Sequence, residues 1–544
     1  MTKPQPRQTH AVLNQAPDRV DVNEFTTNAP LVEAVGRFDA DWAVDDLIET
    51  GRLVGSADFQ RAARLAEQRE PVLRSFDRHG NRIDEVEYDD SYHLVAGESV
   101  AHGSHTAAWA DPRPGANVAR AATFMLFAQV EPGHACPMSM THAVVPALRQ
   151  QPELAERWLP RILSRDYDPR LIAGKTSALF GMAMTEKQGG SDVRANTTVA
   201  VPDGESWLIT GHKWFCSAPM SDAFLVLAQT DAGIGCFLVP RVLEDGTRNV
   251  FRLQRLKDKL GNRSNASSEV EFDGTVGYAV GEQGRGVHTI IEMVARTRLD
   301  CILGTAAGMR QCLAEATWHV RHRAAFGRTL VDQPLMRNVV ADLALESEAA
   351  TAIALRLARA HDVDASDDTA FRRLATAVEK YFVCKRGPGH AYEALECLGG
   401  NGYTEDFPLA RRYREQPVMA VWEGSGNVIA LDILRVLGRE PDAVAAVRDE
   451  IASAATADRR LASLLHSIDA RLAQAAGREP DEIAFDARTL TEDLAVALQA
   501  AVVMGGAPTA VSDAFCATRL GERRGLLYGT IPAGHDVEGI LARI

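Results

Sequence analysis

The apolar pattern of this 544-residue chain changes its period twice, and this change constrains the fold more than any other feature. Helical spacing dominates from about residue 31 to about 165. Between Gly181 and about Gly286 the period becomes two, in short β-rich runs separated by Gly, Asp and Pro turns. Helical spacing then returns and continues toward the C-terminus. The sequence therefore predicts an α+β fold that is mostly α, with an antiparallel barrel or sandwich in the middle.

We expect five segments, since 544 residues exceed what one hydrophobic core usually holds. They are an irregular N-terminal arm at 1–30, an N-terminal helical domain at 31–180, a middle β domain at 181–286, a helical bundle at 287–440 and a C-terminal helical extension at 441–544.

Several helices can be placed more closely. The stretch 119–130 is apolar nearly all round, which predicts a buried helix. Gly-Arg-Glu-Pro-Asp occurs at 438–442 and again at 477–481. We interpret this repeat as a glycine stop followed by a proline start between helices. The segments whose length predicts a four-helix bundle are 287–322, 335–361, 369–398 and a last helix from near Ala420.

Composition narrows the functional classes. The eight cysteines form no C-x-x-C pair, so we expect reduced thiols of a cytoplasmic protein and no metal site. The formal charge of −14 argues against a surface that coats nucleic acid, although a local basic patch stays open. The first thirty residues lack a signal-peptide pattern, and no apolar run reaches the length of a membrane span.

A glycine-rich turn follows the first β-like run of the middle domain. Gly181 to Asp192 reads G-M-A-M-T-E-K-Q-G-G-S-D. Its two glycines allow close backbone approach, and Thr185 and Ser191 supply hydroxyl groups for a ring edge or a phosphate. By itself this turn is equally typical of an ordinary strand connection.

A second stretch, Glu396 to Glu415, reads E-C-L-G-G-N-G-Y-T-E-D-F-P-L-A-R-R-Y-R-E. The two stretches together resemble the paired signatures of the acyl-CoA dehydrogenase flavoproteins, in the expected order and some 200 residues apart. The resemblance implies the fold of that family, with N-terminal helices, a middle β domain and a C-terminal four-helix bundle, and non-covalent FAD as cofactor.

The segment from Trp422 to Asn427 reads W-E-G-S-G-N. A carboxylate between an aromatic ring and a glycine can be desolvated, which raises its pKa toward that of a working base. The alternative is an acidic residue at a helix start. The resemblance implies that Glu423 removes the α-proton of an acyl thioester. Some family members place the base beside the equivalent of Arg298, where this chain has Thr297, which cannot serve as a carboxylate base.

The resemblance also assigns the binding residues. Arg323 would reach the pyrophosphate of a flavin held by a neighbouring subunit, and Arg298 and Ser191 would contact the substrate. Where the family has a threonine or serine facing the flavin, this chain has Cys216, so either hydride transfer is tuned differently or Ser217 substitutes. The implied flavin contacts are Met182, Thr185, Gly190, Ser191, Trp214, Cys216, Ser217, Arg323, Gln333, Glu396, Gly399, Gly400, Ser425 and Asn427.

Details of the chain are closest to one branch of the family, the flavoprotein of the bacterial adaptive response to DNA alkylation. They are the exact turn at 185–192, the stretch 256–267, the opening Gln8-Thr9-His10 and the helical extension after 440. This branch implies a homotetramer, weak dehydrogenation of short branched acyl-CoA such as isovaleryl-CoA, and binding of double-stranded DNA through the C-terminal domain.

Charge does not independently support DNA binding. From Leu437 to Ile544 there are 11 arginines, no lysine and 16 acidic residues, a net charge of −5. A solvated surface used for tetramer packing is the alternative. The second hypothesis for the whole chain is an ordinary acyl-CoA dehydrogenase that passes electrons to an electron-transfer flavoprotein. The candidates for a basic DNA-binding face are Arg435, Arg439, Arg519, Arg523 and Arg524.

Overall fold

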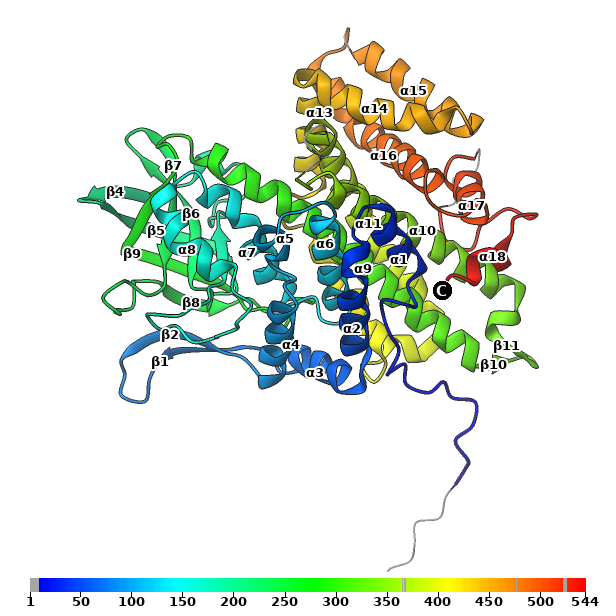
Figure 1. Cartoon of the computed structure of the whole chain (residues 1–544), viewed down its shortest axis with the longest axis horizontal. Helices are drawn as coiled ribbons and strands as arrows, with labels where there is room; N and C mark the ends of the chain where they lie inside the picture. The colour runs from blue at the N-terminus through cyan, green and yellow to red at the C-terminus, as the bar shows by residue number, and fades with distance from the viewer. Residues whose placement is uncertain (1–8, 364, 366–367, 476, 522–525) are drawn as a thin grey trace, which may run out of the picture.

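The computed structural model describes residues 9–363, 365, 368–475, 477–521 and 526–544. A β domain lies at one side of the molecule, long helices fill the centre, and the C-terminal helices cover the far side (Figure 1). Arg523 and Arg524 lie outside the described residues. No described helix combines the length and apolar composition needed to span a membrane.

The N-terminal part contains short helices and a β-hairpin. The sequence analysis did not predict the hairpin, because helical spacing dominates this part of the chain. The hairpin strands β1 (Val72–Phe76) and β2 (Arg82–Glu87) pair antiparallel. They are short and largely polar, so their period of two is weak beside the helical pattern around them. The helices are α1 (Ala29–Arg37), α2 (Val44–Gly55), α3 (Ala57–Gln68), α4 (Asp90–Ala101), α5 (Ala107–Ala110), α6 (Ala116–Ala128), α7 (Ala135–Leu148) and α8 (Pro152–Ile162), with a 3₁₀ turn at Asp41–Ala43.

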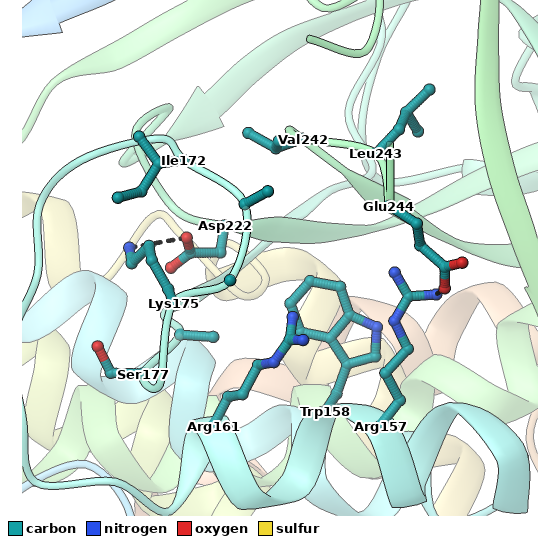
Figure 2. Close-up of a pocket in the computed structure, with 13 residues that line it drawn as sticks. Arg157, Trp158, Arg161, Ile172, Lys175, Ser177, Asp222, Val242, Leu243 and Glu244 are labelled. Atoms are coloured by element: carbon teal, nitrogen blue, oxygen red, sulfur yellow. Dashed lines mark hydrogen bonds and ion pairs between the residues drawn. The ribbon is translucent and has the colours of Figure 1, made fainter. Parts of the chain in front are cut away.

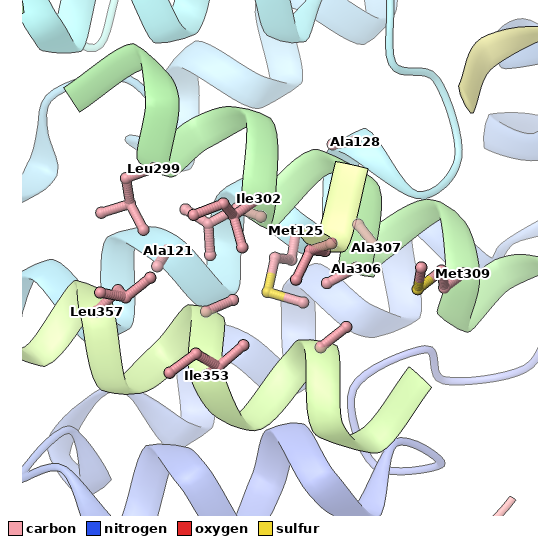
Figure 3. Packing of buried hydrophobic residues seen from close by; sticks show 14 of the residues in the cluster. Ala121, Met125, Ala128, Leu299, Ile302, Ala306, Ala307, Met309, Ile353 and Leu357 are labelled. Atoms are coloured by element: carbon pink, nitrogen blue, oxygen red, sulfur yellow. The ribbon is translucent and has the colours of Figure 1, made fainter. Parts of the chain in front are cut away.

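The predicted buried helix is α6. Eleven of its thirteen residues are buried, because it packs between neighbouring helices on most of its surface. Figure 3 shows Met125 of α6 lying between the side chains of α9 and α10, with Ile302 on one side and Ile353 on the other. This contact joins the N-terminal helices to the central bundle in one apolar core.

The middle domain is a β-barrel. Its pairings run from β4 through β5, β9, β7 and β6 and return to β4, so the ring of strands closes. Most pairings are antiparallel as predicted, but β3 and β4 run parallel to β6. The strands are β3 (Phe180–Ala183), β4 (Val199–Asp203), β5 (Ser206–Ser217), β6 (Ala223–Thr230), β7 (Gly233–Pro240), β8 (Arg252–Leu256) and β9 (Ser267–Val280), with a 3₁₀ turn at Val193–Ala195.

The central bundle follows the predicted order of long helices. The last helix, expected from near Ala420, begins at Gly426, and a helix that the sequence did not indicate precedes it. The helices are α9 (Gly286–His322), α10 (Pro334–Arg359), α11 (Thr369–Glu396), α12 (Pro408–Met419) and α13 (Gly426–Arg439). Between α9 and α10 lies a small hairpin of β10 (Ala324–Ala325) and β11 (Arg328–Thr329), followed by a 3₁₀ turn at Leu330–Asp332. A further 3₁₀ turn at Gly399–Tyr403 follows α11.

The C-terminal extension packs onto this bundle. Its helices α14 and α16 begin at Pro441 and Pro480, as the repeated proline motif predicts. Gln499 of α16 donates a 2.8 Å hydrogen bond to the buried carboxylate of Glu379 on α11. The extension is therefore fixed to the bundle by internal contacts. Its helices are α14 (Pro441–Ala455), α15 (Arg459–Ala475), α16 (Pro480–Met504), α17 (Thr509–Arg519) and α18 (Val537–Leu541).

Candidate active site

The glycine-rich turn after β3 is joined directly to strand β5. The backbone N–H of Trp214 donates to the carbonyl of Thr185 at 2.8 Å. Gly190 lies so close to Thr185 that a Cβ at position 190 would come within 2.3 Å of the Thr185 hydroxyl. The structure thus brings these three predicted flavin residues together, and Gly190 leaves room for the threonine side chain. Ser191, at the end of the turn, is exposed.

A buried ion pair that the sequence reasoning missed holds this arrangement in place. Lys213 Nζ lies 2.8 Å from Glu186 Oε1, and both side chains are fully buried. Glu186 also accepts hydrogen bonds from the backbone N–H groups of Thr197 and Thr198. Burial alone would raise the pKa of Glu186, but these hydrogen bonds and Lys213 lower it overall, so the carboxylate stays ionised. The sequence signal was adjacency, since each charged residue neighbours a predicted flavin contact.

One face of the Trp214 indole ring is covered by a cation. Lys257 Nζ lies 3.3 Å from the centre of the ring, a cation–π contact that leaves the other face for a flat ligand. Lys257 is itself paired with Glu269 at 2.6 Å. These contacts fix the plane of the ring.

Cys216 and Ser217 differ in exposure. The Cys216 side chain is fully buried in the apolar core. Ser217 is only partly buried, and its hydroxyl lies 3.2 Å from that of Ser267. The sequence left Cys216 and Ser217 as alternatives, and the placement favours Ser217. Met182 is likewise nearly buried, at 7% exposure.

The segment that carries Glu423 is held in an unusual conformation. Glu423 has a φ of +61°, a region that side chains other than glycine rarely occupy. Arg298 Nε donates to the Glu423 carbonyl at 3.2 Å, and the buried Lys380 donates to the Gly424 carbonyl at 2.6 Å. Arg298 is itself fixed by Asp432 at 2.8 Å. Two cations therefore hold the strained turn, which is typical of functional sites.

The Glu423 carboxylate has the properties of a base. Its Oε2 atom is shielded from solvent and has no hydrogen-bond partner among the described residues. Burial raises its pKa to about 7, and Arg298, Thr297 and Lys380 limit that rise. Thr297 is completely buried and close enough to influence the carboxylate. The two positions considered for the base are thus neighbours in space.

The remaining predicted contacts are partly buried or exposed. Arg323 donates to the backbone carbonyl of Asn14 in the N-terminal arm at 2.8 Å, and Gln333 donates to Ala325 at 3.0 Å. Gly399 and Gly400 have no heavy atom within 4 Å of where a Cβ would stand. Among the described residues, no hydrogen bond or ion pair joins Arg323 or Gln333 to Thr185 or Glu423. Others of the predicted set, Glu396, Ser425 and Asn427, are exposed.

The arginines predicted to contact DNA differ in availability. Arg519 binds Asp342 and Glu346 at 2.7 and 2.8 Å, and its side chain is only 11% exposed. It stabilises the contact between α17 and α10 and is not free to meet a phosphate. Arg435 is exposed but pairs with Asp432. Arg439 is exposed.

A cavity of about 310 Å³ lies between α8, the segment before β3 and the loop after β7. Figure 2 shows Trp158 on its floor beside Arg157 and Arg161, with Lys175 bound to Asp222 on the other side. None of the predicted flavin or substrate residues lines this cavity. Among the described residues, no group of three or more His, Cys, Asp or Glu is arranged to hold a metal ion.

Three family models match successive parts of the chain. They are the N-terminal domain of adaptive response protein AidB at residues 14–169, the acyl-CoA dehydrogenase middle domain at 181–275 and the acyl-CoA dehydrogenase C-terminal domain at 284–438.

Similar proteins cover most of the chain. AidB of Escherichia coli strain K12 is 48% identical over 440 residues, which is 80% of this chain and 81% of that protein. Acyl-CoA dehydrogenase family member 11 of Caenorhabditis elegans is 29% identical, over 79% of this chain and 73% of its own. The crystal structure of C. elegans ACDH-11 in complex with C11-CoA has a TM-score of 0.85, 25% identity and 97% coverage of both chains. The apo-form of Bd2924 has a TM-score of 0.82 and 26% identity, covering 90% of this chain and 98% of that one.

Proposed function

Because the chain belongs to the acyl-CoA dehydrogenase family, an oxidoreductase family acting on CH–CH bonds, we propose that it oxidises a short branched acyl-CoA thioester such as isovaleryl-CoA at its α and β carbons. The family and its FAD cofactor, both predicted from sequence, are confirmed at this level. The observation that carries the proposal is the Glu423 carboxylate, which has an unpartnered oxygen and a pKa raised to about 7.

The residues present fit a flavin. The Thr185–Gly190 turn forms a cradle with space for the threonine hydroxyl, and Trp214 offers one ring face. Ser217 supplies the hydroxyl that Cys216 cannot. The open surface at Gly399 and Gly400, together with Arg323, would receive the distal half of a flavin from a second subunit in a homotetramer. Phe326, at the tip of the β10–β11 hairpin, is 98% exposed, which supports burial of this region in an assembly.

In this scheme Glu423 takes the α-proton of the thioester. Bound FAD would supply the acceptor for the β-hydride. Arg298 and Lys380 hold the turn so that the carboxylate keeps its direction, and their positive charges stop its pKa from rising further. A base with a pKa near the working pH combines a high ionised fraction with useful proton affinity.

Purification tests the cofactor assignment. We expect a yellow protein with about one FAD per chain that acid precipitation releases intact, since the proposed contacts are all non-covalent. A colourless protein that takes up no added FAD would contradict the proposal.

The rate of flavin reduction should depend on pH through Glu423. Because the carboxylate must be ionised, the rate should fall about tenfold per pH unit below the pKa of about 7 and level off above it. Stopped-flow reduction between pH 5.5 and 8.5 measures this. A rate that is constant across that range would show that another group removes the proton.

DNA association is the second part of the proposal, and similarity to AidB is what supports it. The binding face would include Arg439 and the sequence positions Arg523 and Arg524, with Arg519 left out because it is bound to Asp342 and Glu346. A tetramer could bring arginines of several chains onto one face despite the acidic net charge. Such binding would serve protection against alkylation damage.

Replacing Arg439, Arg523 and Arg524 together by glutamine tests the DNA proposal. The wild-type protein should retain a labelled duplex at about 50 mM salt, with log K falling by about 0.9 per phosphate contacted for each decade of salt. The triple variant should lose retention and keep its flavin spectrum. A matched control is Arg448→Gln, which removes an arginine paired with Asp469. No retention by the wild type would refute DNA association.

An ordinary acyl-CoA dehydrogenase remains the second candidate. The similarity to ACDH-11 extends over 97% of this chain, including the C-terminal helices, and that protein was crystallised with C11-CoA. This favours a catalytic protein whose extension has a packing role. Efficient turnover of one thioester, with an electron-transfer flavoprotein as acceptor, would distinguish this candidate from a weakly active DNA-associated protein.

A further inference from the structure

Helix α16 of the C-terminal extension reaches the turn that follows the proposed base. Arg488 Nε donates a 2.9 Å hydrogen bond to Oδ1 of Asn427, a predicted flavin contact. The position of α16 is set independently by the buried hydrogen bond from Gln499 to Glu379. Arg488 is therefore brought to this place by the packing of the extension on the bundle.

Asn427 lies in the first turn of α13, and this helix start has no negative charge of its own. Ser425 is the N-cap, but its side chain makes no capping hydrogen bond, and the first turn contains no acidic residue. The first backbone N–H groups of a helix have no partner within the helix and carry partial positive charge. The hydroxyl of Ser425 and these N–H groups are thus available together.

Two further cations surround the same helix start. Lys385 lies against Gly426, where a Cβ would come within 2.5 Å of its Cε, and the buried Lys380 binds the Gly424 carbonyl. Lys385 and Arg488 are exposed. Lys385 lies over the Tyr381 ring at 5.4 Å and Arg488 binds Asn427, and neither forms an ion pair in the part of the chain that the structure describes.

The nearby carboxylates are Glu423, whose pKa is raised by burial and lowered in part by Lys380, and Glu492 of α16, which interacts electrostatically with Tyr381, as Arg488 does. Neither carboxylate forms an ion pair with Lys385 or Arg488 in the described part of the chain, and cations without such a partner favour an anionic ligand.

We propose that Arg488 of the C-terminal extension, with Lys385 and the first turn of α13, binds the diphosphate of FAD, so that the cofactor and the docked extension stabilise each other. The inference rests on the proposed function, because similarity to the family is what assigns Ser425 and Asn427 to the flavin. Helix α16 belongs to the segment after residue 438, which the dehydrogenase family models do not cover. By linkage, a ligand that binds only the docked form must stabilise that form.

The experiment compares Arg488→Gln with Arg478→Gln in the full-length protein. Arg478 is a matched control, because it also belongs to the extension but is paired with Asp486. Flavin is removed, and FAD binding to each apo-protein is measured by flavin fluorescence. We expect the dissociation constant of Arg488→Gln to rise about 5- to 50-fold, as for loss of a charge-assisted contact at an exposed site. The control should stay within about twofold of wild type.

A second measurement tests the coupling. Amide hydrogen exchange should show that FAD slows exchange in α14 to α16 of the wild type and of the control, and does so less in Arg488→Gln. Arg323→Ala serves as a positive control, since its loss should weaken FAD binding through the neighbouring subunit without changing this local protection.

The outcomes separate this inference from the proposed function. Unchanged FAD affinity in Arg488→Gln, with weaker binding in Arg323→Ala, would overturn the inference alone. Weaker binding of CoA thioester with unchanged FAD binding would assign the cationic site to the diphosphate of CoA and overturn it too. Failure of wild-type protein to bind FAD would overturn the proposed function as well.

Discussion

Replacing Glu423 by glutamine is expected to lower the rate of flavin reduction by acyl-CoA about 10²- to 10⁴-fold, the usual contribution of a positioned base. The amide has nearly the same shape as the carboxylate but cannot accept the α-proton. The contacts that hold the turn use the backbone carbonyls of Glu423 and Gly424, so they survive the change. Anaerobic stopped-flow reduction, followed at the flavin absorbance, gives the rate.

Stability provides an independent check on the same variant. The folded-state pKa of Glu423 is raised above its ordinary value of 4.5, so between that value and about 7 the folded protein holds a proton that the unfolded chain releases. Ionising Glu423 therefore lowers the free energy of unfolding as pH rises through this window. Glutamine does not ionise, so Glu423→Gln should melt no lower than wild type at pH 8. Glu405→Gln, which removes an exposed carboxylate paired with Arg414, is the control. Wild-type reduction rates in Glu423→Gln would place the base elsewhere.

Replacing Lys213 by methionine is expected to reduce the free energy of unfolding by about 3 to 5 kcal/mol, because it leaves the Glu186 carboxylate buried without its charged partner. Methionine fills much of the lysine volume, so the main loss is electrostatic. The glycine-rich turn should also loosen, since Glu186 anchors it to Thr197 and Thr198. Denaturant unfolding of apo-protein measures the change without a contribution from flavin.

The double variant Lys213→Met with Glu186→Gln separates charge from packing. It removes both charges of the pair, so it should recover part of the stability lost in the single variant. A loss below about 1 kcal/mol in Lys213→Met would show that water reaches Glu186 and that the pair does not anchor the turn.

The elements that could be predicted from the sequence are those whose apolar residues recur at a regular spacing. Long helices such as α9 and α10 begin and end close to their predicted bounds, because their apolar residues recur over many turns. The β1–β2 hairpin and α12 were missed since short elements with polar faces leave little periodic signal.

The residues of the candidate site also fall into those that local motifs identify and those that only the folded chain brings together. Thr185, Trp214 and Glu423 were identified from local motifs, whereas the pairing of Glu186 with Lys213 depends on two strands meeting in the barrel. Arg519 illustrates a prediction that contacts between distant segments make less favourable. Its place in the chain offered a basic residue for DNA, but α17 folds back onto α10, where Asp342 and Glu346 bind the guanidinium. Such contacts between distant segments are not encoded in any short stretch.

The most direct test of the proposed function is anaerobic titration of the purified flavoprotein with a panel of acyl-CoA thioesters, including isovaleryl-CoA and an 11-carbon acyl-CoA. Flavin absorbance reports whether the thioester delivers its hydride. We predict bleaching by at least one short branched thioester, with the rate rising with pH up to about 7 as Glu423 ionises. Absence of bleaching by every thioester, in protein whose flavin dithionite still reduces, would contradict the assignment of acyl-CoA dehydrogenation to this site.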